Sequence, residues 1–455
     1  MRGSKKIDMT QGPIMKLVIL FSLPICIGNI LQQLYNTVDT LIIGNFCGPI
    51  SLAAVGTSGQ PVEFLLCIFL GLGTGVSILV SQYVGRGNRE AVNKTVSTAT
   101  AFLFLCAVPL SVLGLFLGPL LLKIMQCPQD TWDYAVSYIR IIFLGTLGNM
   151  GYNMNAGILR GIGDSQASLL FLLISCVVNI VLDLLFVAVF GMDVTGAALA
   201  TAIAMFASWL FSIVYIRKKY PELELPILPR KPDRFILSRI ISVGLPLGLN
   251  NSIYSIGHIL LQSLINTQGA IFMAGCSVAT KLTGLANVAI SSFSSAATTF
   301  AGQNLGAEHY RRLQKGARQI PLCSGLITGA AGLLMTLFSP VLLGFFTKDP
   351  QVLEMAVHYT RVVLPFTWPF AVFNAMICFV NGIGEVRYPT VINILMLWVV
   401  RIPSAYLTAH FIGGQYLMVC FPISFTFGMC AMAAYFLTKK WRGIRELAQK
   451  EEGTS

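Results

Sequence analysis

The sequence predicts an all-α integral membrane protein with twelve transmembrane helices, arranged as two parallel-repeat six-helix bundles around a central cleft. Three observations predict this class: an apolar composition, twelve apolar segments and an internal repeat. The 455 residues are 55% hydrophobic and only 11% charged, whereas soluble domains carry roughly 25% charged residues. Little of this chain can therefore form a soluble domain.

Twelve segments are apolar and long enough to cross a bilayer, which takes about 20 residues each. The predicted spans are 14–43, 50–83, 94–119, 133–159, 165–190, 195–217, 237–265, 271–303, 316–346, 352–380, 388–411 and 414–438. Several exceed the minimum length, so we expect tilted helices. The first apolar stretch is too long for the core of a cleavable leader, and we expect it to remain in the mature protein.

The distribution of basic residues predicts the orientation. Of the 31 Lys and Arg residues, 25 lie on the side that holds the two termini and the even-numbered connections, and two lie on the other side. Because Lys and Arg concentrate in cytoplasmic loops, we expect both termini in the cytoplasm and the protein in the cell (inner) membrane. We divide the chain into an N-lobe (1–217), a cytoplasmic linker (218–236), a C-lobe (237–440) and a tail (441–455).

The two halves repeat at an offset of about 221 residues. The segment YAVSYIR at 134–140 corresponds to MAVHYTR at 355–361, and RGIGD at 160–164 corresponds to NGIGE at 381–385. Pro24 corresponds to Pro246 at an offset of 222. Motifs repeated at one constant offset indicate internal duplication. Six spans per half give parallel repeats, an arrangement that suits alternating access.

An acidic residue inside the first span is the strongest functional signal. A charge at bilayer depth costs at least about 2.5–3.5 kcal/mol, so such residues are rare and usually functional. Gln32, Asn36 and Asp39 share one helical face. We expect Tyr35 and Asn36 to contact substrate, and Pro24 to act as a hinge because proline bends a helix.

A second acidic residue, Asp183, lies in the fifth span, one turn after Asn179 and therefore on the same face. Asp39 and Asp183 are the only acidic residues that we place deep in spans, so we expect them to meet. With Asn179, Thr201, Asn153 and Gln32, they form a predicted coupling-ion site for H⁺ or Na⁺, two cations between which the residue types do not decide. The alternative is a polar cluster that only holds helices together.

The second half lacks these residues: Leu260, Val400, Ser404 and Pro422 stand at the positions of Asp39, Asn179, Asp183 and Thr201. We therefore expect one ion site, in the N-lobe. Arg401 and Lys281 are the candidate substrate contacts of the C-lobe.

Several function classes are disfavoured. The net charge of +12 follows the loop pattern and does not indicate nucleic acid. The eleven Cys residues show no metal-like spacing, and the motifs of hydrolases and ATPases are absent. We therefore expect no enzyme activity, no cofactor and no metal site besides the coupling ion. The expected partners are the lipid bilayer and a small-molecule substrate, and we expect a monomer.

At these residues the chain resembles the MATE family, the multidrug and toxic compound extrusion transporters. In its prokaryotic DinF-like branch, the counterparts of Asp39, Asn179, Asp183 and Thr201 form the N-lobe motif. The NorM-like branch also uses acidic residues in the C-lobe, where this chain has Tyr254 and Arg401. The resemblance implies a secondary antiporter that exports cationic, amphipathic compounds in exchange for H⁺ or Na⁺. The alternatives are a lipid-linked oligosaccharide flippase of the wider superfamily, favoured by Arg401 and Lys281, and a membrane scaffold or sensor without transport.

Overall fold

The computed structural model describes residues 6–125 and 127–453, and these residues are overwhelmingly helical. By contacts the chain separates into two compact units. Unit 1 comprises the first seven residues and Ile27–Leu249, and unit 2 comprises Asp8–Cys26 and Asn250–Ser455. The predicted all-α membrane class is confirmed.

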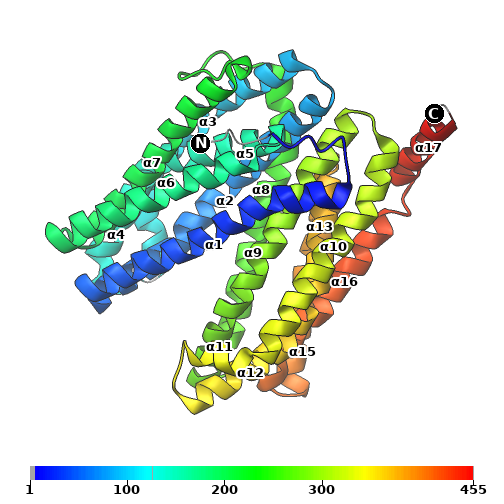
Figure 1. The fold of residues 1–455 in the computed structure, drawn as a ribbon. Coiled ribbons are helices and arrows are strands. Elements are labelled where there is room, and N and C mark those ends of the chain that lie inside the picture. Colours follow the sequence, from blue (N-terminus) through cyan, green and yellow to red (C-terminus); the bar gives the residue numbers. More distant parts are fainter. Residues whose placement is uncertain (1–5, 126, 454–455) are drawn as a thin grey trace. The chain divides into compact units, whose positions relative to one another are not determined.

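Each predicted span has a helical counterpart, and Figure 1 shows the helices along the chain. Unit 1 contains most of α1 (Ile14–Phe46), together with α2 (Pro49–Gly85), α3 (Arg89–Ile124), α4 (Gln129–Leu144), α5 (Thr146–Ile162), α6 (Ser165–Asp183), α7 (Asp193–Lys219) and the start of α8 (Arg234–Asn266). Its apolar core is built mainly from α2, α3, α4, α5 and α7.

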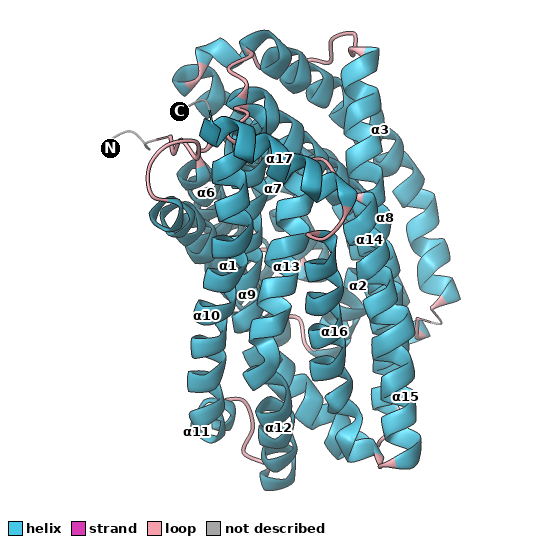
Figure 2. Cartoon of the chain, turned by 90° about the vertical axis from the view of Figure 1, so that its right-hand side faces the viewer, coloured by secondary structure: helices cyan, strands magenta, loops and turns pink. Residues whose placement is uncertain are grey.

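Unit 2 contains the rest of α8 and the first part of α1. Its other helices are α9 (Ala270–Gly306), α10 (Tyr310–Leu337), α11 (Ser339–Gly344), α12 (Pro350–Val363), α13 (Thr367–Gly382), α14 (Arg387–Ile394), α15 (Ile402–Phe411), α16 (Cys420–Tyr435) and α17 (Lys439–Gly453). Figure 2 shows α14 and α15 following one another along one rod. A π-helical segment, Leu395–Arg401, joins them.

Ten helical segments of the described chain are long and apolar enough to span a membrane. The two predicted spans outside this set have physical explanations. The fourth is divided at Gly145 into α4 and α5, each shorter than a full span. The seventh is α8, whose length is sufficient but whose sequence carries Arg234, Arg239 and several Asn and Ser residues.

The first helix of each repeat is shared between the units. Helix α1 contains Pro24 and changes unit after Cys26, and α8 contains Pro246 and changes unit after Leu249. Within unit 1, the start of α8 packs against α2 at very short range: a Cβ added to Gly71 would lie 2.1 Å from the backbone nitrogen of Gly248. Only glycine permits this backbone approach.

Candidate functional site

Two carboxyl groups meet in unit 1. Asp39 lies in the second half of α1, and Asp183 is the last residue of α6. Asp183 is fully buried and Asp39 is partly buried. The two side chains are close enough to hydrogen-bond through one shared proton. The meeting of these acids is what the sequence led us to expect.

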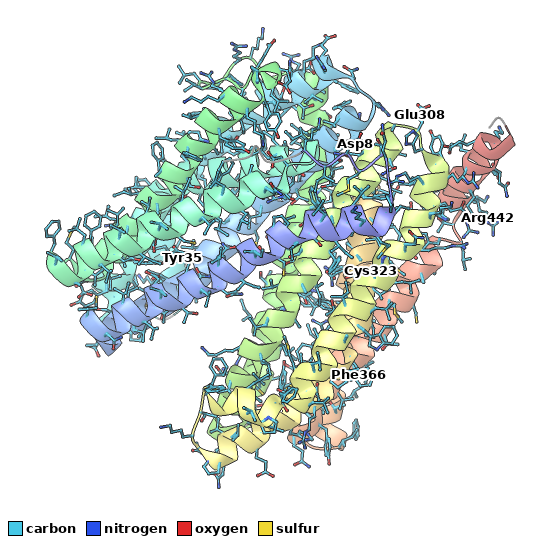
Figure 3. The ribbon with its side chains drawn as sticks, in the orientation of Figure 1. Asp8, Tyr35, Glu308, Cys323, Phe366 and Arg442 are labelled. Carbon is cyan, nitrogen blue, oxygen red and sulfur yellow. The ribbon has the colours of Figure 1, made fainter. Side chains whose placement is uncertain are left out.

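Two hydroxyl groups and an amide surround the acids. Asn179, one turn before Asp183, is fully buried and donates from Nδ2 to Thr201 Oγ1 of α7 at 3.3 Å. The hydroxyl of the buried Tyr35 on α1 also hydrogen-bonds with Thr201. Figure 3 shows Tyr35 on the α1 ribbon. Helices α1, α6 and α7 thus each contribute polar groups to one cluster.

The cluster has more acceptors than donors. Four buried oxygen atoms have no hydrogen-bond donor among the described residues: Asp39 Oδ1, both carboxylate oxygens of Asp183, and Asn179 Oδ1. Buried polar atoms are nearly always paired, and an unpaired one costs about 1–3 kcal/mol. The arrangement therefore lacks a positive centre, which one proton or one hard cation would supply.

The end of α6 is locally irregular. The α-helix stops at Asp183 and continues as the π-helical segment Leu184–Val189. Such segments are rare and frequently mark functional sites, because the wider turn changes the direction in which side chains point. Here the change falls directly after the carboxylate.

Three predicted residues lie apart from this cluster. Gln32 and Asn36 are exposed on α1. Asn153 donates to the backbone oxygen and to Oδ1 of Asn149, both at 2.9 Å. Helical periodicity places Gln32 and Asn36 on the face of Asp39, but it does not determine which neighbouring helix covers each turn. Their roles in ion or substrate binding stay predictions.

The sequence reasoning missed one residue near the acids, Tyr138 of α4. Its phenol interacts electrostatically with Tyr35, Asp39 and Asp183. A signal was present, because Tyr138 lies in the repeated motif at 134–140, where Tyr359 is its counterpart.

Unit 2 has a buried cation instead of buried acids. Arg401 is 1% exposed, and its guanidinium lies over the rings of Tyr254, Phe421 and Phe425. Its Nε donates to Ser424 Oγ at 2.9 Å and its Nη1 to Tyr254 Oη at 3.0 Å. Cation–π contacts with three rings partly replace the water that this charge has lost.

The other predicted residues of the C-lobe and the hinge are placed as follows. Lys281 is exposed on α9. Pro24 is buried within an uninterrupted α1, two residues before that helix changes unit. Its role as a hinge stays a prediction.

Comparison with known proteins gives consistent results. The MatE family model matches residues 24–185 and again residues 246–407. The probable multidrug resistance protein YpnP of Bacillus subtilis is 28% identical over 98% of this chain and all of that protein. Another probable multidrug resistance protein of the same organism, YoeA, is 30% identical over 92% of each.

The fold is similar to solved structures. One, described as the outward-facing conformation of a multidrug resistance MATE family transporter of the MOP superfamily, has a TM-score of 0.89 and 25% identity. The likeness covers 99% of this chain and all of the other. The two family-model matches begin at Pro24 and Pro246, the prolines that correspond in the repeat.

Proposed function

The chain belongs to the MATE family of multidrug efflux transporters, and from this membership we propose that it is a secondary antiporter driven by H⁺ or Na⁺. The observation that carries the proposal is the set of four buried oxygen atoms without donors around Asp39 and Asp183. A transporter needs a coupling-ion site that can both release and bind its ion. A cluster in which every oxygen atom already had a hydrogen-bond donor could not do this.

The proposed mechanism uses the difference between the filled and the empty site. A cation that enters from outside neutralises the pair of acids and removes their mutual repulsion. The ion drives transport only if it binds the two conformational states with different affinity. Because Asp39 and Asp183 lie on different helices, a cation shared between them favours the state in which α1 and α6 stay together.

We propose organic, cationic and amphipathic compounds as substrates, by resemblance to the family. The anionic character of the empty acid pair supports this class, because substrate and coupling ion can then compete for one negatively charged region. Orientation with both termini in the cytoplasm belongs to the same proposal and is supported by the basic residues of the even-numbered connections.

The test is transport by purified protein in liposomes, with pH and Na⁺ gradients imposed separately. We expect one gradient to drive a fluorescent cationic dye across the membrane, and Asp39→Asn and Asp183→Asn each to abolish this dependence. Ser404→Ala is the matched control, because Ser404 is the repeat counterpart of Asp183. If Asp39→Asn transports dye and responds to the ion gradient like the unaltered protein, the proposal is wrong.

The flippase alternative rests on Arg401. A lipid-linked pyrophosphate requires several cationic groups together, and the structure instead holds Arg401 among aromatic rings while Lys281 is exposed. Movement of a fluorescent lipid-linked sugar in the same liposomes, lost in Arg401→Met, would favour this alternative over drug export.

A further inference from the structure

A cationic depression lies at the start of α10 in unit 2, far from the residues of the coupling site in the sequence. It has a volume of about 380 Å³ and is lined by Ile14, His309, Arg311, Arg312, Lys315 and Glu451. Three of these side chains carry a permanent positive charge and one carries a negative charge. Asp8 and Glu308 lie at the same end of unit 2 (Figure 3) but do not line the depression.

A carboxylate already occupies part of this depression. Glu451, near the end of α17, accepts a hydrogen bond from the backbone amide of Arg311 at 2.9 Å. Helix α17 packs against α10, and its Trp441 and Ala448 are buried. The depression therefore accommodates an anionic group. Of its cations, Arg312 also donates from Nε to the backbone oxygen of Met9 at 3.2 Å and lies over the ring of Phe300.

The corresponding place in unit 1 is built differently. There Asn88 caps α3 with its own side chain, which accepts from the amide of Ala91 at 2.9 Å. Glu90 forms an ion pair with Lys94 at 2.7 Å. At the repeat offset of 221, Glu90 corresponds to Arg311 and Ala91 to Arg312. The N-terminus of α3 is thus closed by its own residues, whereas the start of α10 has no side-chain cap of its own. The basic residues also lie at different positions, because Arg89 of α3 corresponds to Tyr310.

The depth of the depression matches the phosphate layer of a bilayer. The lipid-facing surface of α10 begins near Leu322 and Leu326, which are 61% and 75% exposed. Lys315 precedes Leu322 by seven residues, about 10 Å along a helix. Headgroups occupy roughly 5–8 Å beyond the hydrocarbon on each side, and a lysine side chain reaches across the remaining distance. Ile14, which also lines the depression, is the first residue of the apolar helix α1.

We propose that this depression binds the phosphate of an anionic phospholipid from the leaflet that contacts the start of α10. Arg311, Arg312 and Lys315 complement the phosphate charge, and basic pockets beside membrane helices are recognised sites for such headgroups. Glu451 competes with the phosphate for the amide of Arg311, so lipid binding and the docking of the end of α17 exclude one another. This site is independent of the ion site and of the transported substrate.

The experiment is native mass spectrometry of the purified full-length protein titrated with phosphatidylglycerol or phosphatidylcholine. We expect phosphatidylglycerol to bind more tightly, and Arg311→Ala with Lys315→Ala to weaken its first association constant by about fivefold for each removed cation. Glu451→Gln is expected to strengthen it. Lys94→Ala, the repeat counterpart of the Lys315 change, is the matched control and is expected to alter it less than twofold.

Three outcomes would overturn the proposal. The first is an equal loss in the double variant and in Lys94→Ala, which would indicate a general charge effect. The second is equal affinity for phosphatidylcholine. The third is an equal rise in the thermal unfolding temperature with inorganic phosphate alone, which would assign the depression to a soluble anion. Unfolding temperatures of all variants in detergent micelles without added lipid check that they fold. Because Arg311 and Lys315 are exposed, we expect these temperatures to stay unchanged.

Discussion

The interiors of the two units carry opposite charges on related frameworks. Unit 1 brings two acids together at Asp39 and Asp183, with oxygen atoms that lack donors. Unit 2 buries Arg401 among three aromatic rings and two hydroxyl groups. Both interiors contain a π-helical segment, Leu184–Val189 and Leu395–Arg401. One backbone design thus tolerates either sign of charge, provided that each charge finds partners suited to it.

The difference agrees with the proposal of a single ion site in a duplicated protein. At the repeat offset, Asp183 corresponds to Ser404, whose hydroxyl donates to the backbone oxygen of Arg401. The buried Arg401 gives the interior of unit 2 a permanent positive charge, which disfavours a second cation there. Under the proposed function, the exchangeable charge belongs to unit 1.

The largest effect on transport is expected from the acids themselves. Asp183→Asn removes the charge and leaves an amide of nearly the same shape, so folding is preserved while cation binding is not. We expect gradient-driven transport to fall at least about tenfold, the equivalent of about 1.4 kcal/mol of lost ion binding. Dye efflux from liposomes measures it. Ser404→Asp adds an acid to unit 2 and leaves unit 1 unchanged. If it lowers gradient-driven transport as much as Asp183→Asn does, the loss of negative charge in unit 1 is not the cause of the defect.

The next prediction compares how two ion pairs at equivalent positions of the repeat contribute to stability. Asp164 is buried, caps α6 through Ala167, and accepts from Tyr220 at 2.7 Å and Lys219 at 2.9 Å. Its counterpart Glu385 pairs with the exposed Lys440. Asp164→Ala should lower the free energy of unfolding by about 3–5 kcal/mol, and Glu385→Ala by less than about 1 kcal/mol. Denaturant titration in mixed micelles measures both, and similar losses would contradict the comparison.

A third comparison concerns the helices shared between the units. Gly71 meets Gly248 backbone to backbone, whereas their counterparts Ser292 and Cys26 meet through side chains. Gly71→Ala forces α2 and α8 apart and should cost about 1–3 kcal/mol of stability. Ser292→Ala removes hydrogen bonds of its hydroxyl, including those with Val288 and Cys26, without adding volume, and should cost about 0.5–1.5 kcal/mol. Denaturant titration in mixed micelles measures both losses of stability. A larger loss in Ser292→Ala than in Gly71→Ala would refute this account of how α2 and α8 cross.

A smaller effect on stability than that of Asp164→Ala is expected at Tyr220. Burial, followed by its hydrogen bond to Asp164, raises the pKa of this phenol above its ordinary value near 10. Tyr220→Phe should therefore cost about 1–2 kcal/mol at neutral pH. The folded state holds the phenol proton more tightly than the unfolded state, so the stabilisation is complete below pH 10 and declines above it. The difference between the two proteins should then shrink in unfolding curves recorded near pH 11, and a constant difference would exclude this linkage.

The sequence predicts the helices and the acids better than it predicts what surrounds them. Apolar length alone identifies the spans, and the cost of a buried charge singles out Asp39 and Asp183. Periodicity also places Gln32 and Asn36 on that face, and both are exposed on α1, whereas Tyr35 between them is buried. Periodicity does not determine which turns of α1 the neighbouring helices cover. Tyr138 lies near the acids from α4. The repeated motif at 134–140 singles this tyrosine out, but its approach to the acids depends on how α4 packs and not on the motif itself.

The sharing of α1 and α8 has a consequence for dissecting this molecule. Each unit contains the opening turns of a helix whose remainder belongs to the other unit, and the exchange occurs twice, near Pro24 and near Pro246. Cutting the chain in the connection at 218–236 would therefore leave each fragment without a piece of its own interior. Each fragment would carry the segment that completes the other fragment's unit. Each fragment therefore needs the other present while it folds.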